Sequence, residues 1–229
     1  MQTTTKEQDA EWYSSLGPKY ETTFGHDPGL LRFLDNILAR LPPQANILDV
    51  GCGTGKPVAS TLVNAGHSVT GIDVSDVMIG LSQKAVPGGQ FHVADMRTYD
   101  PPNDLRFDAV LNILSLFSLK RAEIENTAIR WNRWLPVGGI LCIGTVAAED
   151  CHPETKGQGY DEDKCCARDI GFRFMGADIK IDLMTRLGWE KLLGEAGFEI
   201  IETMNDLFVP AKESDCDEEN HYFILAKKI

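Results

Sequence analysis

The stretch Ile47-Leu-Asp-Val-Gly-Cys-Gly-Thr-Gly-Lys-Pro57 decides the fold of this 229-residue chain. Ile47, Leu48 and Val50 predict a buried strand, and the glycines that follow predict a turn that leads into a helix near Pro57. A glycine turn lets a ligand lie against the backbone, and the first N–H groups of a helix have no partner within it. The stretch therefore predicts a ligand site at the end of a strand.

Strands and helices alternate on both sides of this stretch. Such alternation predicts a doubly wound α/β fold, in which helices cover both faces of a mostly parallel sheet. The last two strands have no helix between them, so they can pair antiparallel. We expect seven strands with an antiparallel last strand. The predicted strands are 47–50, 69–72, 91–94, 107–113, 140–146, 198–204 and 221–227, and the predicted helices are 27–41, 58–65, 75–85, 120–135 and 186–196.

The sequence has no internal repeat and no clear linker, so residues 1–229 are predicted to form one domain. Residues 1–26 are expected to form an N-terminal cap, with Met1–Glu11 frayed and aromatic residues after it. Residues 149–182 are polar and weakly periodic, which predicts a loop-like lid. Residues 206–220 are expected to form a long acidic connection between the last two strands.

Composition excludes several classes of function. The net charge is −12, which argues against binding to nucleic acid or to an anionic membrane surface. No apolar run approaches the about 20 residues of a membrane span, and the polar N-terminus lacks a signal peptide's apolar core. The six cysteines include no Cys-x-x-Cys pair, so a cytoplasmic protein is expected. Cys151, His152, Cys165 and Cys166 do not have common zinc-site spacing, so no metal is predicted.

Candidate ligand residues follow four predicted strands. Gly51, Asp73, Asp95 and Asn112 lie at or near carboxyl ends of strands, which meet at one edge of a parallel sheet. Two cofactors are bound by such sites, NAD(P) and S-adenosylmethionine. The NAD(P) fingerprint requires a third glycine at position 56, which is Lys56, and it gives no role to Asp95.

The motif Asp49-Val-Gly-x-Gly-x-Gly55, the acids Asp73 and Asp95, and the closing pair of strands resemble a class I S-adenosylmethionine-dependent methyltransferase. The likeness extends from about Trp12 to Lys227. The segments 171–176, 188–198 and 221–227 resemble a small-molecule branch of that family. The resemblance implies S-adenosylmethionine as cofactor and S-adenosylhomocysteine as product.

The resemblance also implies a role for each site residue. Asp73 would accept from both ribose hydroxyls, Asp95 from the adenine amino group, and Asp49 would orient the glycine turn or face the cofactor ammonium. Each of these acids has an alternative role in capping a turn or helix, and the apolar and aromatic members have an alternative role in packing. The predicted cofactor-binding residues are Tyr13, Tyr20, Asp49, Gly51, Cys52, Gly53, Asp73, Val74, Met78, Ala94, Asp95, Met96 and Asn112.

The methyl acceptor is less well defined. The sequence after Asn112 lacks the Asn/Asp-Pro-Pro-aromatic motif of base and amide methylation, so a small organic metabolite methylated on oxygen or nitrogen is expected. Phe172, Phe174 and Met175 are candidates to line its pocket. Six acids, Glu149, Asp150, Glu154, Asp161, Glu162 and Asp163, either favour a cationic acceptor or form a solvated face.

No catalytic residue is predicted from a motif. A general base is needed only for a protonated acceptor, and His26, Glu149, Asp150, His152 and His221 are candidates without motif support. Two other hypotheses stay open: a cofactor-binding protein that performs a non-methylating rearrangement, and a partner subunit that has the fold alone.

Overall fold

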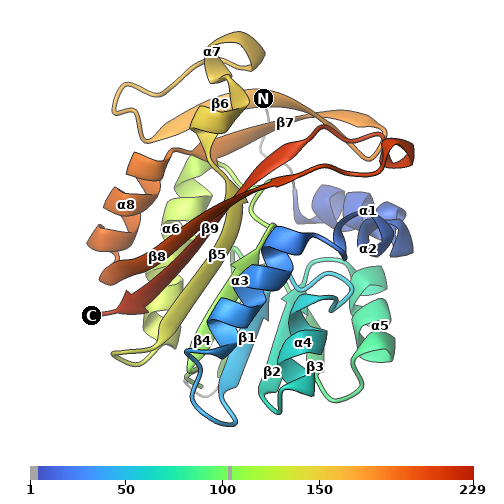
Figure 1. Cartoon of the computed structure of the whole chain (residues 1–229), viewed down its shortest axis with the longest axis vertical. Helices are drawn as coiled ribbons and strands as arrows, with labels where there is room; N and C mark the ends of the chain where they lie inside the picture. Colours follow the sequence, from blue (N-terminus) through green and yellow to red (C-terminus); the bar gives the residue numbers. More distant parts are fainter. Residues whose placement is uncertain (1–4, 103–104) are drawn as a thin grey trace.

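The computed structural model describes residues 5–102 and 105–229. Its centre is a seven-stranded sheet with strand order β3-β2-β1-β4-β5-β9-β8 (Figure 1). Five strands from β1 to β5 run parallel, and β9 runs antiparallel to both β5 and β8, as the sequence predicted. The strands are β1 (Asn46–Val50), β2 (Ser68–Asp73), β3 (Gln90–Val93), β4 (Ala109–Ile113), β5 (Ile140–Val146), β8 (Phe198–Phe208) and β9 (Glu219–Lys228).

The antiparallel direction of β9 has a consequence for the site. Parallel strands end at one edge of the sheet, whereas an antiparallel neighbour begins there. His221, near the start of β9, therefore pairs with Val146 at the end of β5. Residues 206–208 and 219–220, expected to belong to a connection, extend β8 and β9 toward this edge.

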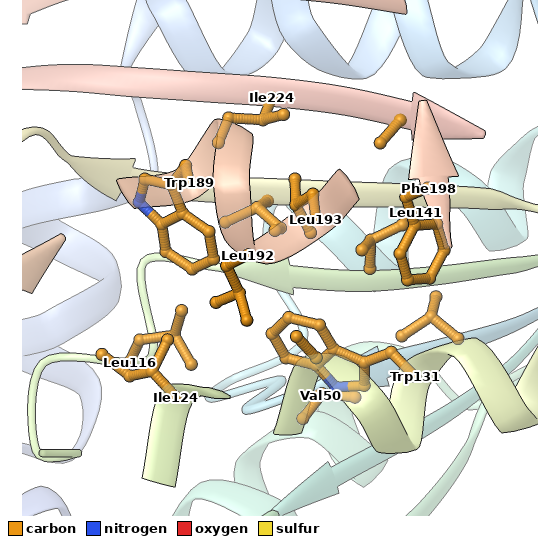
Figure 2. Close-up of a cluster of buried hydrophobic side chains, with 14 of the residues drawn as sticks. Val50, Leu116, Ile124, Trp131, Leu141, Trp189, Leu192, Leu193, Phe198 and Ile224 are labelled. Carbon is orange, nitrogen blue, oxygen red and sulfur yellow. The ribbon is translucent and has the colours of Figure 1, made fainter. Parts of the chain in front are cut away.

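Helices cover both faces of the sheet. One core joins the sheet to α3 and α4, and Figure 1 shows these two helices in front of the strands. The other core joins it to α6 and α8, where Trp131 and Trp189 are fully buried (Figure 2). The five helices of the sheet layers are α3 (Pro28–Leu38), α4 (Val58–Asn64), α5 (Asp76–Ala85), α6 (Arg121–Trp134) and α8 (Arg186–Glu195).

The N-terminal segment is helical, so the prediction of a frayed start was wrong for residues 6–11. Helix α1 (Lys6–Leu16) begins at a capping box in which Thr5 and Gln8 satisfy each other's backbone N–H groups. Helix α2 (Pro18–Phe24) follows it directly. The hydroxyl groups of Ser14 and Ser75 lie 2.8 Å apart and connect α1 to the cap of α5. Met1–Thr4 lie outside the described residues.

The segment 149–182 is more regular than the predicted loop-like lid. After the 3₁₀ helix η2 (Ala148–Cys151) and α7 (Pro153–Lys156), strands β6 (Cys166–Phe174) and β7 (Ala177–Met184) form a separate antiparallel hairpin. A register shift between Ala167 and Ile170, with Asp169 at a φ of 50°, breaks the alternation that identifies a strand. The connection from β8 to β9 contains the 3₁₀ helix η3 (Lys212–Ser214).

Candidate active site

The edge where the parallel strands end contains a pocket below α1 and α2. Of the thirteen residues predicted to bind the cofactor, the pocket brings ten together. These ten are Tyr13, Tyr20, Gly51, Gly53, Asp73, Val74, Met78, Ala94, Asp95 and Met96. Asp49 and Cys52 line a small adjoining pocket that shares Tyr20, Gly51 and Gly53 with it. Asn112 lines neither, because it is fully buried beneath the turn.

The glycine turn has two kinds of glycine. Gly51 has a φ of 74°, and a Cβ there would lie 2.4 Å from the Cβ and Oγ of Ser115. Gly53 has a φ of 52°, but a Cβ there would meet no atom within 4 Å. Gly51 thus allows two chain segments to approach, whereas Gly53 faces open space at the pocket. Gly55 has a φ of 79°, and a Cβ there would lie 3.2 Å from the Cβ of Ser82 of α5.

Asp73, at the end of β2, holds the turn in place. One carboxylate oxygen accepts the N–H of Gly53 at 3.0 Å, and the other accepts the N–H of Ser75 at 2.9 Å. Burial raises the pKa of Asp73, and these backbone hydrogen bonds oppose that rise. The turn-capping role that the sequence allowed for Asp73 is therefore present. It coexists with a place in the pocket wall, because each carboxylate oxygen can accept a second hydrogen bond.

Asp95 belongs to an ion-pair network that reaches α1. Nε of Arg97 lies 2.9 Å from one oxygen of Asp95, and Nη2 lies 2.8 Å from Asp9. All three side chains are at most 14% exposed. Sequence reasoning missed Arg97 and Asp9. The only signal for Arg97 is its place two residues after a predicted site acid.

Three buried oxygens in or near the turn have no hydrogen-bond partner among the described residues: Oδ2 of Asp49, Oγ1 of Thr54 and Oδ1 of Asn112. Burial, together with the charge of Asp73, raises the pKa of Asp49 to about 7. The amide of Asn112 donates to the carbonyl of Val50 at 3.2 Å. Unpaired buried acceptors are costly in a folded protein, so a donor that binds here relieves that cost. A cationic ammonium group fits the position of Asp49.

Tyr13 and Tyr20 line the pocket from α1 and α2. Burial is the largest cause of the raised pKa of both phenols, and the charges of Asp73 and Glu219 contribute further. Both side chains therefore stay protonated and present hydroxyl donors and aromatic surface to the pocket. An aromatic face near a sulfonium is favourable by about 1–2 kcal/mol when water is excluded.

A second, larger cavity of about 870 Å³ adjoins this pocket. Its walls come from α1, the loop before α6, the end of β5, the hairpin β6–β7 and the start of β9. Asp9, Tyr13 and Ser118 line both cavities and mark where they meet. The larger cavity has the size of a site for a small organic molecule.

The aromatic lining was partly predicted. Phe172 and Phe174 of β6 line the larger cavity, as does Trp12 of α1. Met175 lies outside the lining, since it forms the tight turn between β6 and β7 with a φ of 48°. Glu219 lines the cavity and was missed, because the site residues were sought after strands that run the other way.

Of the six acids proposed to favour a cationic acceptor, four form ion pairs, and none of the six lines the cavity. Asp161 and Asp163 pair with Arg121 at 2.9 and 2.5 Å. Asp150 pairs with Arg186 at 2.7 Å. The lid is thus joined to α6 and α8 by ion pairs, while Glu154 and Glu162 are exposed, as expected of a solvated face.

The five candidate bases are dispersed. His26 and His152 are exposed. Glu149 accepts the backbone N–H of Arg186, and Asp150 pairs with its guanidinium. His221 is fully buried next to the larger cavity. In the described part of the chain, no group of three or more metal-ligating side chains is found, and no helix is long and apolar enough to span a membrane.

Comparison with known proteins identifies the fold and its cofactor. Residues 47–139 match the family described as "Methyltransferase domain", and this range holds the glycine turn and the acids of the pocket. Residues 47–139 thus carry a methyltransferase domain of the kind that uses S-adenosylmethionine. The match covers the sheet from β1 to the residue before β5.

An O-methyltransferase from Pyrenophora dematioidea is 35% identical over 128 residues, which cover 52% of this chain and 46% of the relative. The chain spans about half the length of the first curated relatives it matches.

Two solved structures share the fold across nearly the whole chain. The [4+2]-cyclase SpnF has a TM-score of 0.69 at 17% identity and covers 100% of this chain and 98% of its own. A 1,6-didemethyltoxoflavin-N1-methyltransferase from Burkholderia thailandensis, solved with that compound and S-adenosylhomocysteine, has a TM-score of 0.67 at 17% identity and covers 96% and 86%. At such identities the likeness concerns the fold alone.

Proposed function

We propose that the protein transfers the methyl group of S-adenosylmethionine to an oxygen or nitrogen of a small organic metabolite with an apolar body. One observation carries this proposal: the 870 Å³ cavity, with Phe172 and Phe174 in its wall, meets the cofactor pocket at Tyr13. A cofactor in one and an acceptor in the other would face each other at this junction.

The residues of the cofactor pocket have distinct roles in this proposal. Asp73 accepts from the ribose hydroxyls, Asp95 from the adenine amino group, and Asp49 from the methionine ammonium. Val74, Met78 and Ala94 pack against the rings. The cofactor supplies an already activated methyl group. The chain's own contribution is therefore to bind and align an acceptor, which is worth several kcal/mol, roughly 7–11 in favourable cases.

In this proposal, the cap 1–26 and the lid 149–182 exclude water from the two cavities. Helix α1 contributes to the walls of both cavities, and the lid hairpin closes the larger one. Two similar proteins, an O-methyltransferase and an N1-methyltransferase of a small molecule, support both acceptor atoms. The net charge of −12 supports a small-molecule acceptor over nucleic acid.

A methyl-transfer screen tests the proposal. The purified protein is incubated with methyl-labelled S-adenosylmethionine and a panel of phenols, alcohols, carboxylates, amines and thiols on matched apolar bodies. Label in an oxygen or nitrogen product is the expected result. Label in no product, combined with tight binding of S-adenosylhomocysteine, would contradict it and favour a non-methylating rearrangement, for which the fold of SpnF is a precedent.

A further inference from the structure

Near the start of β9, Glu219 and His221 form a hydrogen-bonded series of three buried ionisable side chains with Asp27. We call it the Glu219–His221–Asp27 cluster. Nε2 of His221 lies 3.0 Å from a carboxylate oxygen of Glu219, and Nδ1 lies 2.8 Å from one of Asp27. Asp27 and His221 are fully buried, and Glu219 is 7% exposed. A neutral imidazole donates through one nitrogen only, so two carboxylate partners call for the imidazolium.

The surroundings fix the imidazolium in one orientation. Burial lowers the pKa of His221, but the hydrogen bonds to Asp27 and Glu219 outweigh it and raise the pKa to about 9. The ring of Phe208 stacks on the imidazole with centroids 5.3 Å apart. Asp27 also accepts the backbone N–H of Gly29 at 2.8 Å, which ties it to the start of α3. His221 therefore holds Glu219 firmly.

Glu219 faces the site from this cluster. It lines the larger cavity, and its charge contributes to the raised pKa of Tyr13 and of Tyr20, which line the cofactor pocket. His221 binds the oxygen Oε2. The other oxygen, Oε1, accepts no hydrogen bond from residues 5–102 or 105–229. A carboxylate oxygen is thus available next to the junction of the two cavities.

The other carboxylates of the cavity wall are in different situations. Asp9 is bound to Arg97. The side chain of Asp178 is 89% exposed and pairs with Arg173. Glu11 is exposed. Among the described residues that line the cavity, Glu219 is the buried carboxylate whose charge is not paired with an arginine or a lysine.

We propose that Glu219 is the catalytic residue that accepts the proton of a hydroxyl acceptor, and that His221 and Asp27 are positioning residues that hold it; this rests on the proposed methyl transfer. In the step, a bond forms between the acceptor oxygen and the methyl carbon, and the bond from that carbon to sulfur breaks. Sulfur keeps the electron pair, and the hydroxyl proton passes to Glu219.

The weak basicity of a carboxylate favours a hydroxyl acceptor over an amine acceptor. As the oxygen gains a methyl group its proton becomes strongly acidic, so a carboxylate is a sufficient base. A methylated amine keeps its proton, because an ammonium is a weaker acid than a carboxylic acid by about six pKa units. The Glu219–His221–Asp27 cluster therefore favours a phenol or alcohol over an amine.

The first test compares Glu219→Gln with Glu199→Gln, which changes an exposed glutamate near the start of β8 that lines neither cavity. With the hydroxyl acceptor that the screen identifies, kcat of Glu219→Gln is expected to fall about 100-fold or more, the usual weight of a general base. Affinity for S-adenosylhomocysteine, measured by calorimetry, is expected to stay within about twofold of the wild type, since the cofactor pocket is unchanged. Glu199→Gln keeps both values.

The second test addresses His221 and has a readout besides activity. In Asp27→Asn, where the new side chain can still cap α3, the imidazole signals of His221 in NMR spectra are expected to titrate at a lower pH than in the wild type. In His221→Gln, kcat is expected to fall about 10-fold or more with little change in the KM of the acceptor, because Glu219 loses the partner that orients it. The titratable groups whose charges interact with Glu219 or His221 are Asp27, Tyr13, Tyr20, Cys151 and Cys216.

The outcomes separate the two proposals. If the wild type methylates amines or thiols but no hydroxyl, the role of Glu219 is refuted while methyl transfer stands. The same holds if Glu219→Gln keeps more than about a third of kcat with a hydroxyl acceptor, or if folded His221→Gln keeps more than about half of it. If the wild type methylates nothing, both proposals fall, and S-adenosylhomocysteine binding then shows whether the cofactor pocket is intact.

Discussion

The cofactor pocket and the larger cavity adjoin each other but are built in different ways. The pocket takes most of its residues from the ends of β1 to β4 and the turns that follow them, within residues 51–119. The cavity combines α1, the hairpin β6–β7 and the start of β9, which are far apart in the sequence. A site made of consecutive strand ends carries a local motif, whereas a site made by distant segments does not. Four predictions test this contrast.

The largest effect is expected at Gly51. Gly51 has a φ of 74°, and Gly51→Ala would place a Cβ 2.4 Å from Ser115. We therefore expect the variant to distort the turn and to lose cofactor affinity. We expect a loss of about 3 kcal/mol or more in the free energy of unfolding by urea, because strain and overlap add. Gly53→Ala meets no atom within 4 Å and is the matched control, with a cost near 1 kcal/mol. Equal costs for the two variants would contradict the distinction between them.

Asp73→Ala tests the cofactor pocket without changing the lining of the larger cavity. It removes the oxygens that accept from Gly53 and Ser75 and that are assigned to the ribose. Affinity for S-adenosylhomocysteine is expected to drop about 10-fold or more, the weight of a charge-assisted hydrogen bond. Calorimetry measures it, and Asp76→Ala, exposed on the first turn of α5, is the control. An unchanged affinity would refute the assignment of this site.

Asp49→Asn is expected to separate stability from binding. Because burial raises the pKa of Asp49 to about 7, the folded free protein binds a proton that the unfolded chain releases near pH 4. The ionised form therefore destabilises the free protein above pH 7, and the variant is expected to be more stable at pH 8. This advantage shrinks as the pH falls from 7 to 4.

The same variant is expected to bind the cofactor about fivefold more weakly at pH 8, because the amide cannot pair with an ammonium. Wild-type affinity is expected to decline as the pH falls below about 7, while the affinity of Asp49→Asn changes little. Thermal unfolding and calorimetry between pH 5 and pH 8, roughly the span over which the carboxyl titrates, measure both quantities. A variant that is less stable at pH 8 would show that Asp49 is paired in the free protein.

The smallest effect is expected at Asp9, which contributes to both cavities. Asp9→Asn weakens the contact between α1 and Arg97, but Arg97 keeps Asp95 as a partner. We expect a loss of roughly threefold in S-adenosylhomocysteine affinity, since one charged hydrogen bond becomes a neutral one. Faster trypsin cleavage after Lys6 should accompany it, and Glu7→Gln on the exposed side of α1 is the control. A change in acceptor KM alone would show that α1 serves only the larger cavity.

Sequence patterns were reliable where a residue's role depends on its neighbours in the chain. The order of the strands, the caps Asp27, Ser75 and Thr185, and the position of Asp73 follow from local rules. The hairpin β6–β7 was missed because of the register shift after Ala167, although Ile179, Ile181 and Leu183 of β7 do alternate with polar residues. The helical start of the chain was missed because α1 is largely polar and is held by Asp9 and Ser14.

The sequence by itself determined the sheet and its cofactor, and it predicted the edge of the sheet where the pocket lies, because parallel strands place their following turns together whatever the loops contain. Only the tertiary structure decided what lines the larger cavity beside that pocket. His221 was one of five candidate bases without a motif, and Glu219 lay in a stretch expected to be a connection. The antiparallel pairing of β9 with β5 brings both to the active edge and buries them against Asp27, 194 residues away from His221. Such a cluster depends on burial and long-range contact, which local sequence patterns do not record.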